Sequence, residues 1–125
     1  MMPVFLVALG GALGALARYF VATVFARRFG TGWPYGTLFI NLTGCFVIAL
    51  FLTLAAERMP SLNGGWRYFF PVGFVGAYTT FSTYEYELWR LWTLREVGAA
   101  FGYFAASNVL GFAAVVCGAW LARAL

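Results

Sequence analysis

The sequence contains no histidine, lysine or aspartate, so eight arginines and four glutamates supply all of its side-chain charge. Histidine and aspartate are frequent ligands of catalytic metals and frequent general bases. Because both are missing, metal-dependent and imidazole-based catalysis lose their usual residues. We therefore expect no enzymatic activity.

Cysteine is scarce as well. Cys45 and Cys117 each lie within an apolar run, where a thiol usually behaves as a small buried hydrophobic group, so we expect no disulfide. The net charge of +4 comes from arginines that are scattered between apolar runs and form no basic patch. This distribution argues against nucleic acid as a partner and favours phospholipid headgroups.

Apolar sequence is what the chain has in abundance: 63% of its 125 residues are hydrophobic and 10% are charged. A helix needs about 20 mainly apolar residues to cross a membrane. The uncharged runs are Met1–Ala17, Phe29–Ala56, Tyr68–Tyr84 and Val97–Ala122. We therefore predict an all-α membrane protein, a single transmembrane domain over residues 1–125 with helices at about 3–25, 33–56, 67–92 and 97–121.

The third of these segments contains a stretch of poor helix formers, from Gly76 to Glu85, with the sequence GAYTTFSTYE. Irregular backbone at membrane depth persists only where it is buried in protein or lines an aqueous path. We therefore predict a break in the third helix near residues 76–81, and we interpret the break as a site.

The arginines at the two ends of the predicted bundle are nearly balanced. One end carries Arg58, Arg67 and Arg123, and the other carries Arg27, Arg28, Arg90 and Arg95. Positive residues in short loops normally decide which side faces the cytoplasm. Our hypothesis is that the chain inserts in both orientations and pairs with an inverted copy; a single orientation set by weak cues is the alternative.

Several polar side chains lie inside predicted spans. Asn41 shares a helix face with Thr37, and its amide either forms a bond between helices or donates to a passing ligand. In the fourth helix, Tyr103 and Ser107 are four residues apart, with Asn108 beside the second. Two polar tracks that face each other favour a lined pathway.

The residues after the break suggest how an anion could be held. Phe81 and Tyr84 share a face if this segment is helical, and their ring edges carry partial positive charge. The hydroxyls of Ser82 and Thr83 could donate to the same anion. The alternative for Phe81 and Tyr84 is simple packing, which is the more common role of an aromatic pair in a membrane helix.

Three charged residues remain near these spans. Arg18 either extends to water or supplies positive potential at an anion-collecting vestibule. Glu85 and Glu87 are shallow in the third segment, and Arg90 provides Glu87 with an ordinary partner on the helix surface.

Over essentially its whole length the chain resembles the Fluc (CrcB) fluoride channels. Four matching pieces occur in the right order: Gly14-Ala15-Leu16-Ala17-Arg18-Tyr19, GWPYGTLFIN ending at Asn41, GFVGAYTTFSTYEYE ending at Glu87, and Gly102-Tyr103. The second and third pieces are highly specific. The resemblance implies a fluoride-selective channel of a bacterial-type plasma membrane that lets fluoride leave the cytoplasm passively and so reduces its toxicity.

The resemblance also implies an antiparallel homodimer with two pores and a structural sodium ion at the dimer interface. Backbone carbonyls of Gly76 and Thr79 would hold the sodium. The pore amide of the family corresponds to Asn41, and its stacked rings correspond to Phe81 and Tyr84.

The chain departs from the family pattern at a few positions. Ala77 stands where many relatives have a second glycine, and Tyr84 replaces the usual second phenylalanine. Some relatives continue a hydroxyl track along the fourth helix where this chain has Gly111 and Val115, which leaves Tyr103, Ser107 or Asn108 to serve instead.

Two other functions are compatible with four short membrane helices. A small proton-coupled multidrug exporter should carry a carboxylate in its first helix, and Pro3–Phe25 has none. In a non-transporting scaffold subunit, Asn41 and the hydroxyls of the break would only hold helices together. An intramembrane hydrolase is remote, because no base accompanies any serine.

Overall fold

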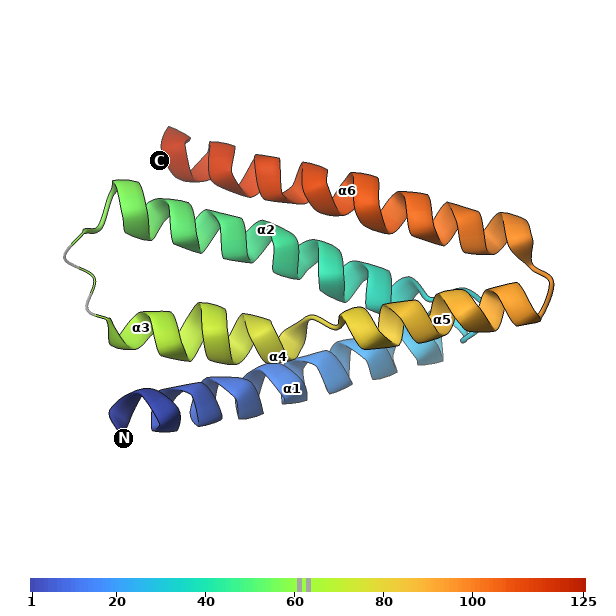
Figure 1. Cartoon of the computed structure of the whole chain (residues 1–125), viewed down its shortest axis with the longest axis horizontal. Helices are drawn as coiled ribbons and strands as arrows, with labels where there is room; N and C mark the ends of the chain where they lie inside the picture. Colours follow the sequence, from blue (N-terminus) through green and yellow to red (C-terminus); the bar gives the residue numbers. More distant parts are fainter. Residues whose placement is uncertain (61, 63) are drawn as a thin grey trace.

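The computed structural model describes residues 1–60, 62 and 64–125, and every regular element within them is helical. Four crossings lie side by side, and both termini are at the same end (Figure 1). Three crossings are single helices, each long and apolar enough to span a membrane: α1 (Met2–Phe29), α2 (Tyr35–Glu57) and α6 (Val97–Ala124). The chain is thus a multi-pass membrane protein.

The third crossing is assembled from short pieces. It begins with α3 (Gly65–Arg67), continues as the π-helix η1 (Tyr68–Val75) and α4 (Gly76–Tyr78), and ends with α5 (Phe81–Thr93). Thr79 and Thr80, between α4 and α5, adopt extended conformations with ψ of 158° and 113°. The interruption lies inside the range in which the hydroxyl-rich sequence placed it.

The end of α1 differs from its expected position, near residue 25, for an identifiable reason. α1 continues to Phe29 because Arg27 and Arg28 occupy its last turn, where positive charge interacts favourably with the helix dipole. Gly30, with φ of 76°, then ends the helix.

At the opposite end of the bundle, Ser61 and Asn63 belong to the expected turn of the second connection but lie outside the described residues.

Glycines allow the helices to approach closely within the chain. A Cβ at Gly10 or Gly14 would collide with the carbonyl oxygen of Phe69 or Phe74, and one at Gly118 would collide with Phe46. α1 therefore packs against η1, and α6 packs along α2, at distances that only glycine permits.

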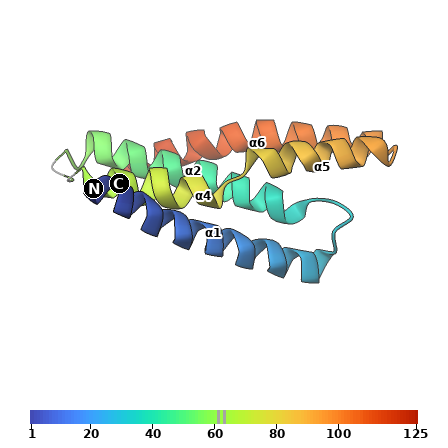
Figure 2. The ribbon, with the colours of Figure 1, turned by 60° about the horizontal axis from the view of Figure 1, so that its bottom comes forward.

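Beyond the break, α1 separates from the third crossing. It packs against η1 and α4 but diverges from α5, as Figure 2 shows. Most large apolar side chains point outwards, as expected for a surface that faces lipid, and the largest fully buried side chains are Ile40, Leu91 and Tyr103.

Candidate functional site

Asn41 of α2 holds the break in the third crossing. Its Oδ1 accepts a hydrogen bond from the Thr80 backbone N–H at 2.9 Å, and its Nδ2 donates to the Thr80 carbonyl at 3.1 Å. Because the backbone N–H can only donate, the amide orientation is determined. An amide nitrogen has two hydrogens, so one of them remains after the bond to Thr80.

Threonine hydroxyls stabilise the backbone on both sides of the break. The Thr80 side chain caps α5 by accepting from the Thr83 N–H at 3.3 Å, and its own hydroxyl donates to Thr83 Oγ1 at 2.9 Å. Thr79 Oγ1 donates to the Val75 carbonyl at 3.0 Å. The methyl group of Thr79 packs at Gly44 of α2, where a Cβ would collide with it.

These bonds redirect two backbone donors. In a continuous helix, the N–H groups of Thr80 and Thr83 would donate to the carbonyls of Gly76 and Thr79. In this structure they donate to Asn41 and to the Thr80 hydroxyl instead. The two carbonyls that the family resemblance implies as sodium ligands thus lose their usual helical donors.

A cavity of about 300 Å³ lies beside the break. We call it the break cavity; it is lined by Asn41, Gly44, Cys45, Ile48, Val75, Thr79, Thr80, Phe81, Tyr84, Ser107 and Asn108. No arginine or glutamate is among these lining residues. The Ser107 hydroxyl is buried without a hydrogen-bond partner among the described residues, which leaves it free to donate to a guest.

Phe81 and Tyr84 differ in their surroundings. Phe81 is 72% exposed in the single chain, whereas Tyr84 is 6% exposed. Their ring centroids are 5.8 Å apart at 47°, and Tyr84 packs edge-on against Tyr103 at 5.1 Å. Phe81 therefore contributes little to the core of this chain.

Glu87 has different partners from those expected. The sequence suggested an ordinary surface pair with Arg90, but Arg90 donates to the Thr31 carbonyl at 2.9 Å. The Glu87 carboxylate instead accepts from Thr37 of α2 and Tyr103 of α6, each at 2.8 Å. It joins three crossings. The sequence had indicated both partners only as members of two polar tracks, Thr37 with Asn41 and Tyr103 with Ser107, and not as partners of Glu87.

Arg18 and Thr83 line a separate hollow of about 400 Å³ where α1 diverges from α5. Its other lining residues are Ala15, Tyr19, Ala22, Thr37, Ile40 and Thr80. Thr80 therefore borders both this hollow and the break cavity. Ser82 is exposed and lines neither of the two.

The structure thus brings together some of the expected pathway residues and separates others. Asn41, Phe81, Tyr84 and Ser107 meet at the break cavity, while Tyr103 contacts it only through the ring of Tyr84. The residue that the sequence left as one of three options, Asn108, also lines the cavity.

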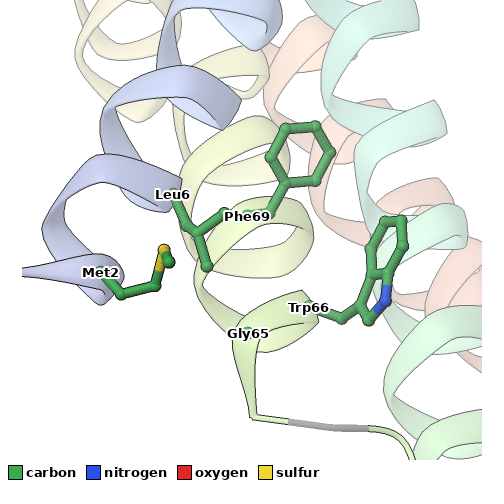
Figure 3. Close-up of a pocket in the computed structure, with 5 residues that line it drawn as sticks. All are labelled: Met2, Leu6, Gly65, Trp66 and Phe69. Atoms are coloured by element: carbon green, nitrogen blue, oxygen red, sulfur yellow. The ribbon is translucent and has the colours of Figure 1, made fainter.

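A further pocket of about 430 Å³ lies at the start of α1 and α3, between Met2, Leu6, Gly65, Trp66 and Phe69 (Figure 3). The side chains that line it are apolar apart from the indole N–H of Trp66. Such a surface suits a lipid chain better than an ion.

Comparison with known proteins assigns the family. The model of the family "CrcB-like protein, Camphor Resistance (CrcB)" matches residues 5–119. A protein of Acidobacterium capsulatum is 54% identical over 90% of this chain and 89% of its own length. A protein of Synechococcus sp. is 46% identical over 95% of this chain and 91% of its own length. A protein of Solibacter usitatus is 44% identical over 98% of this chain and 99% of its own length. All three relatives are named "Fluoride-specific ion channel FluC". The chain belongs to the CrcB family.

Proposed function

We propose that this chain forms a fluoride-selective channel in the plasma membrane, through which fluoride leaves the cytoplasm passively and becomes less toxic to the cell. The names of the relatives given above support fluoride as the ion that passes. The observation that carries the proposal is the break cavity, which gathers hydrogen-bond donors without a fixed positive charge. The proton-coupled exporter and the scaffold receive no support from the comparisons.

The free donors explain why a small anion can pass. The second amide hydrogen of Asn41 and the unpaired hydroxyl of Ser107 can replace part of the hydration shell of fluoride. Conduction requires sites that bind an ion well enough to admit it and weakly enough to release it. Neutral donors and ring edges meet both conditions, whereas an arginine at the same place would hold the anion too strongly.

In this proposal the pathway extends beyond the break cavity. Arg18 and Thr83 collect fluoride in the hollow beside α1, and Ser82 and the edges of Phe81 and Tyr84 pass it along α5. Tyr103 borders the route through its contact with Tyr84.

A second copy of the chain, inserted in the opposite orientation, completes the pore. Phe81 is largely exposed in one copy of the chain, and a Cβ added at Gly98 or Gly102 would meet no other part of the described structure within 4 Å. Both features suit a partner surface, since close helix contacts in membranes use small residues. The near balance of arginines between the two ends supports insertion in both orientations.

A sodium ion at the subunit interface fits the backbone of the break. The carbonyls of Gly76 and Thr79 lack their helical donors and are suitable acceptors for a hard cation. No cluster of three or more acidic, histidine or cysteine side chains occurs in the described part of the chain, and the proposed ligands are backbone oxygens. Bound sodium would supply fixed positive charge near the pores.

Purified protein in liposomes loaded with fluoride tests the proposal. We expect a fluoride electrode to record rapid efflux when a potassium ionophore balances the charge, without ATP or a proton gradient, and much slower efflux of chloride. Protein-free liposomes are the control. Silent proteoliposomes would favour the scaffold, and efflux that depends on a proton gradient would favour an exporter.

A further inference from the structure

The Tyr84 hydroxyl and Asn108 form a pair that determines which hydrogen bonds each can make. Asn108 Nδ2 donates to the Phe104 carbonyl at 2.8 Å and to Tyr84 Oη at 3.1 Å. A carbonyl can only accept, so this atom must be the amide nitrogen, and both of its hydrogens are used. Tyr84 Oη therefore accepts from Asn108, and its own proton is not part of that bond.

The ring of Tyr84 is held in place from two sides. It packs edge-on against Tyr103 and is tilted against Phe81, with centroid distances of 5.1 Å and 5.8 Å. Rotation of the hydroxyl about the C–O bond is the freedom that remains. A phenol hydrogen prefers the ring plane, so a donor on one side of the oxygen directs the hydrogen to the other side.

The remaining direction is available for a guest in the break cavity. Tyr84, Asn108 and Ser107 all line this cavity, and within the described residues the Tyr84 hydroxyl has no partner other than Asn108. A buried O–H without an acceptor is costly, so a bound anion stabilises it. Short O–H donors favour a small, hard anion over a larger one.

We propose that Asn108 is a positioning residue, which by donating to Tyr84 Oη aims the Tyr84 proton into the break cavity, and that this proton is a fluoride-selecting donor. The inference deepens the proposed function and rests on it. It assigns a role to the Tyr84 hydroxyl, which a phenylalanine at this position would lack.

Four variants test the pairing by fluoride and chloride efflux: Tyr84→Phe, Asn108→Leu, Asn108→Asp, and Tyr84→Phe combined with Asn108→Asp. Loss of one donor to an anion corresponds to roughly a tenfold change, so we expect Tyr84→Phe to lower the fluoride-to-chloride flux ratio by about that factor. Asn108→Leu should lower it less, because the hydroxyl still samples the cavity. The exposed neighbour Val109→Leu serves as the control and should leave the ratio unchanged.

Asn108→Asp distinguishes a residue that aims the Tyr84 proton from one that only supports the fold. Its carboxylate can only accept, so the Tyr84 proton turns towards it and away from the cavity. We expect the flux ratio to fall further than in Asn108→Leu, and we expect the aspartate to add little once Tyr84→Phe has removed the proton. Repulsion by the carboxylate slows fluoride and chloride alike, so an aspartate effect of equal size on the flux ratio in both backgrounds would show that it does not act through the Tyr84 proton and would overturn the inference.

The infrared C–O stretch of Tyr84, assigned by subtraction of the Tyr84→Phe spectrum, gives a readout that does not depend on transport. We expect fluoride, but not chloride, to shift the band in the wild-type protein, and Asn108→Leu to shift it without fluoride. If neither fluoride nor Asn108→Leu shifts the band, the inference is overturned, even if fluoride flux is normal. A band that responds to Asn108→Leu in protein that transports no fluoride would instead contradict the proposed function.

Discussion

Asn41 acts on the backbone and on the cavity with the same amide. Its oxygen and one of its hydrogens satisfy both polar groups of Thr80, and its second hydrogen remains for a guest. The bond between helices and the donation to a ligand, which the sequence posed as alternatives, are therefore compatible in one side chain.

Asn41→Asp tests this double role. Aspartate keeps the acceptor for the Thr80 N–H, but it removes the donor and places negative charge on the cavity wall. Repulsion between like charges a few ångströms apart costs several kcal/mol near a protein surface, so fluoride efflux should fall by at least about tenfold. Efflux from liposomes with equal protein content provides the measurement, and wild-type flux from the variant would remove Asn41 from the pathway.

Glu87 is the residue whose role the sequence concealed. Its partners, Thr37 and Tyr103, come from two other crossings, so their proximity depends on tertiary packing. Arg90, three residues away, offered a local partner that the folded chain does not use. Spacing along one helix reveals neighbours on that helix, whereas Glu87 is bound across helices.

Glu87→Gln should destabilise the fold by about 1–3 kcal/mol, because one of its two hydroxyl donors loses an acceptor. Glu85→Gln is the matched control, since Glu85 lies two residues away on the exposed side of α5. Thermal unfolding in detergent compares the two variants. Equal unfolding temperatures would show that the loss of one of these two acceptors costs no stability, and would contradict this account.

At the scale of elements, the sequence indicated the break but not the π-helix that precedes it. Hydroxyl side chains at positions 79, 80 and 83 signal a local interruption because they can bond backbone groups. η1 contains Pro71, which lacks an N–H, and it lies against the glycine face of α1. Its geometry depends on that neighbour, which a pattern within one segment does not show.

The close contact between α1 and η1 predicts different outcomes for two adjacent glycines. A Cβ at Gly10 would collide with the Phe69 carbonyl, whereas one at Gly11 meets only the Gly73 oxygen, at 3.9 Å. Gly10→Ala should destabilise the protein by about 1–3 kcal/mol through overpacking. Gly11→Ala has the same gain in helix propensity and should be neutral or slightly stabilising. Unfolding in detergent measures both, and an equally stable Gly10→Ala would contradict this packing.

At the scale of the whole molecule, composition alone was sufficient to predict a membrane protein of helices. Three helices of the required length and hydropathy confirm that class. The arrangement of two copies depends on charges at the ends of the bundle and on surfaces that one subunit leaves open, and it stays a prediction.

Shifting the arginine balance tests insertion in both orientations. Arg27→Gln with Arg28→Gln removes charge from one end, and Arg58→Gln with Arg67→Gln removes it from the other. Each double variant should insert mainly one way, so each alone should give little fluoride flux and the two expressed together should restore it. A reporter at the carboxyl terminus measures the orientation. Full activity from a variant that inserts in one orientation only would exclude the antiparallel dimer.

The central claim, that fluoride passes through the break cavity beside Phe81, is tested most directly by electrode-recorded efflux from Phe81→Ile. Phe112→Ile is the control, since Phe112 is equally exposed, at 72%, but lies on α6 outside the cavity. If the Phe81 ring edge guides the anion, Phe81→Ile should reduce fluoride flux by at least about tenfold while the protein assembles normally, because the charged ion loses a favourable contact. Equal flux from wild type, Phe81→Ile and Phe112→Ile would contradict the claim.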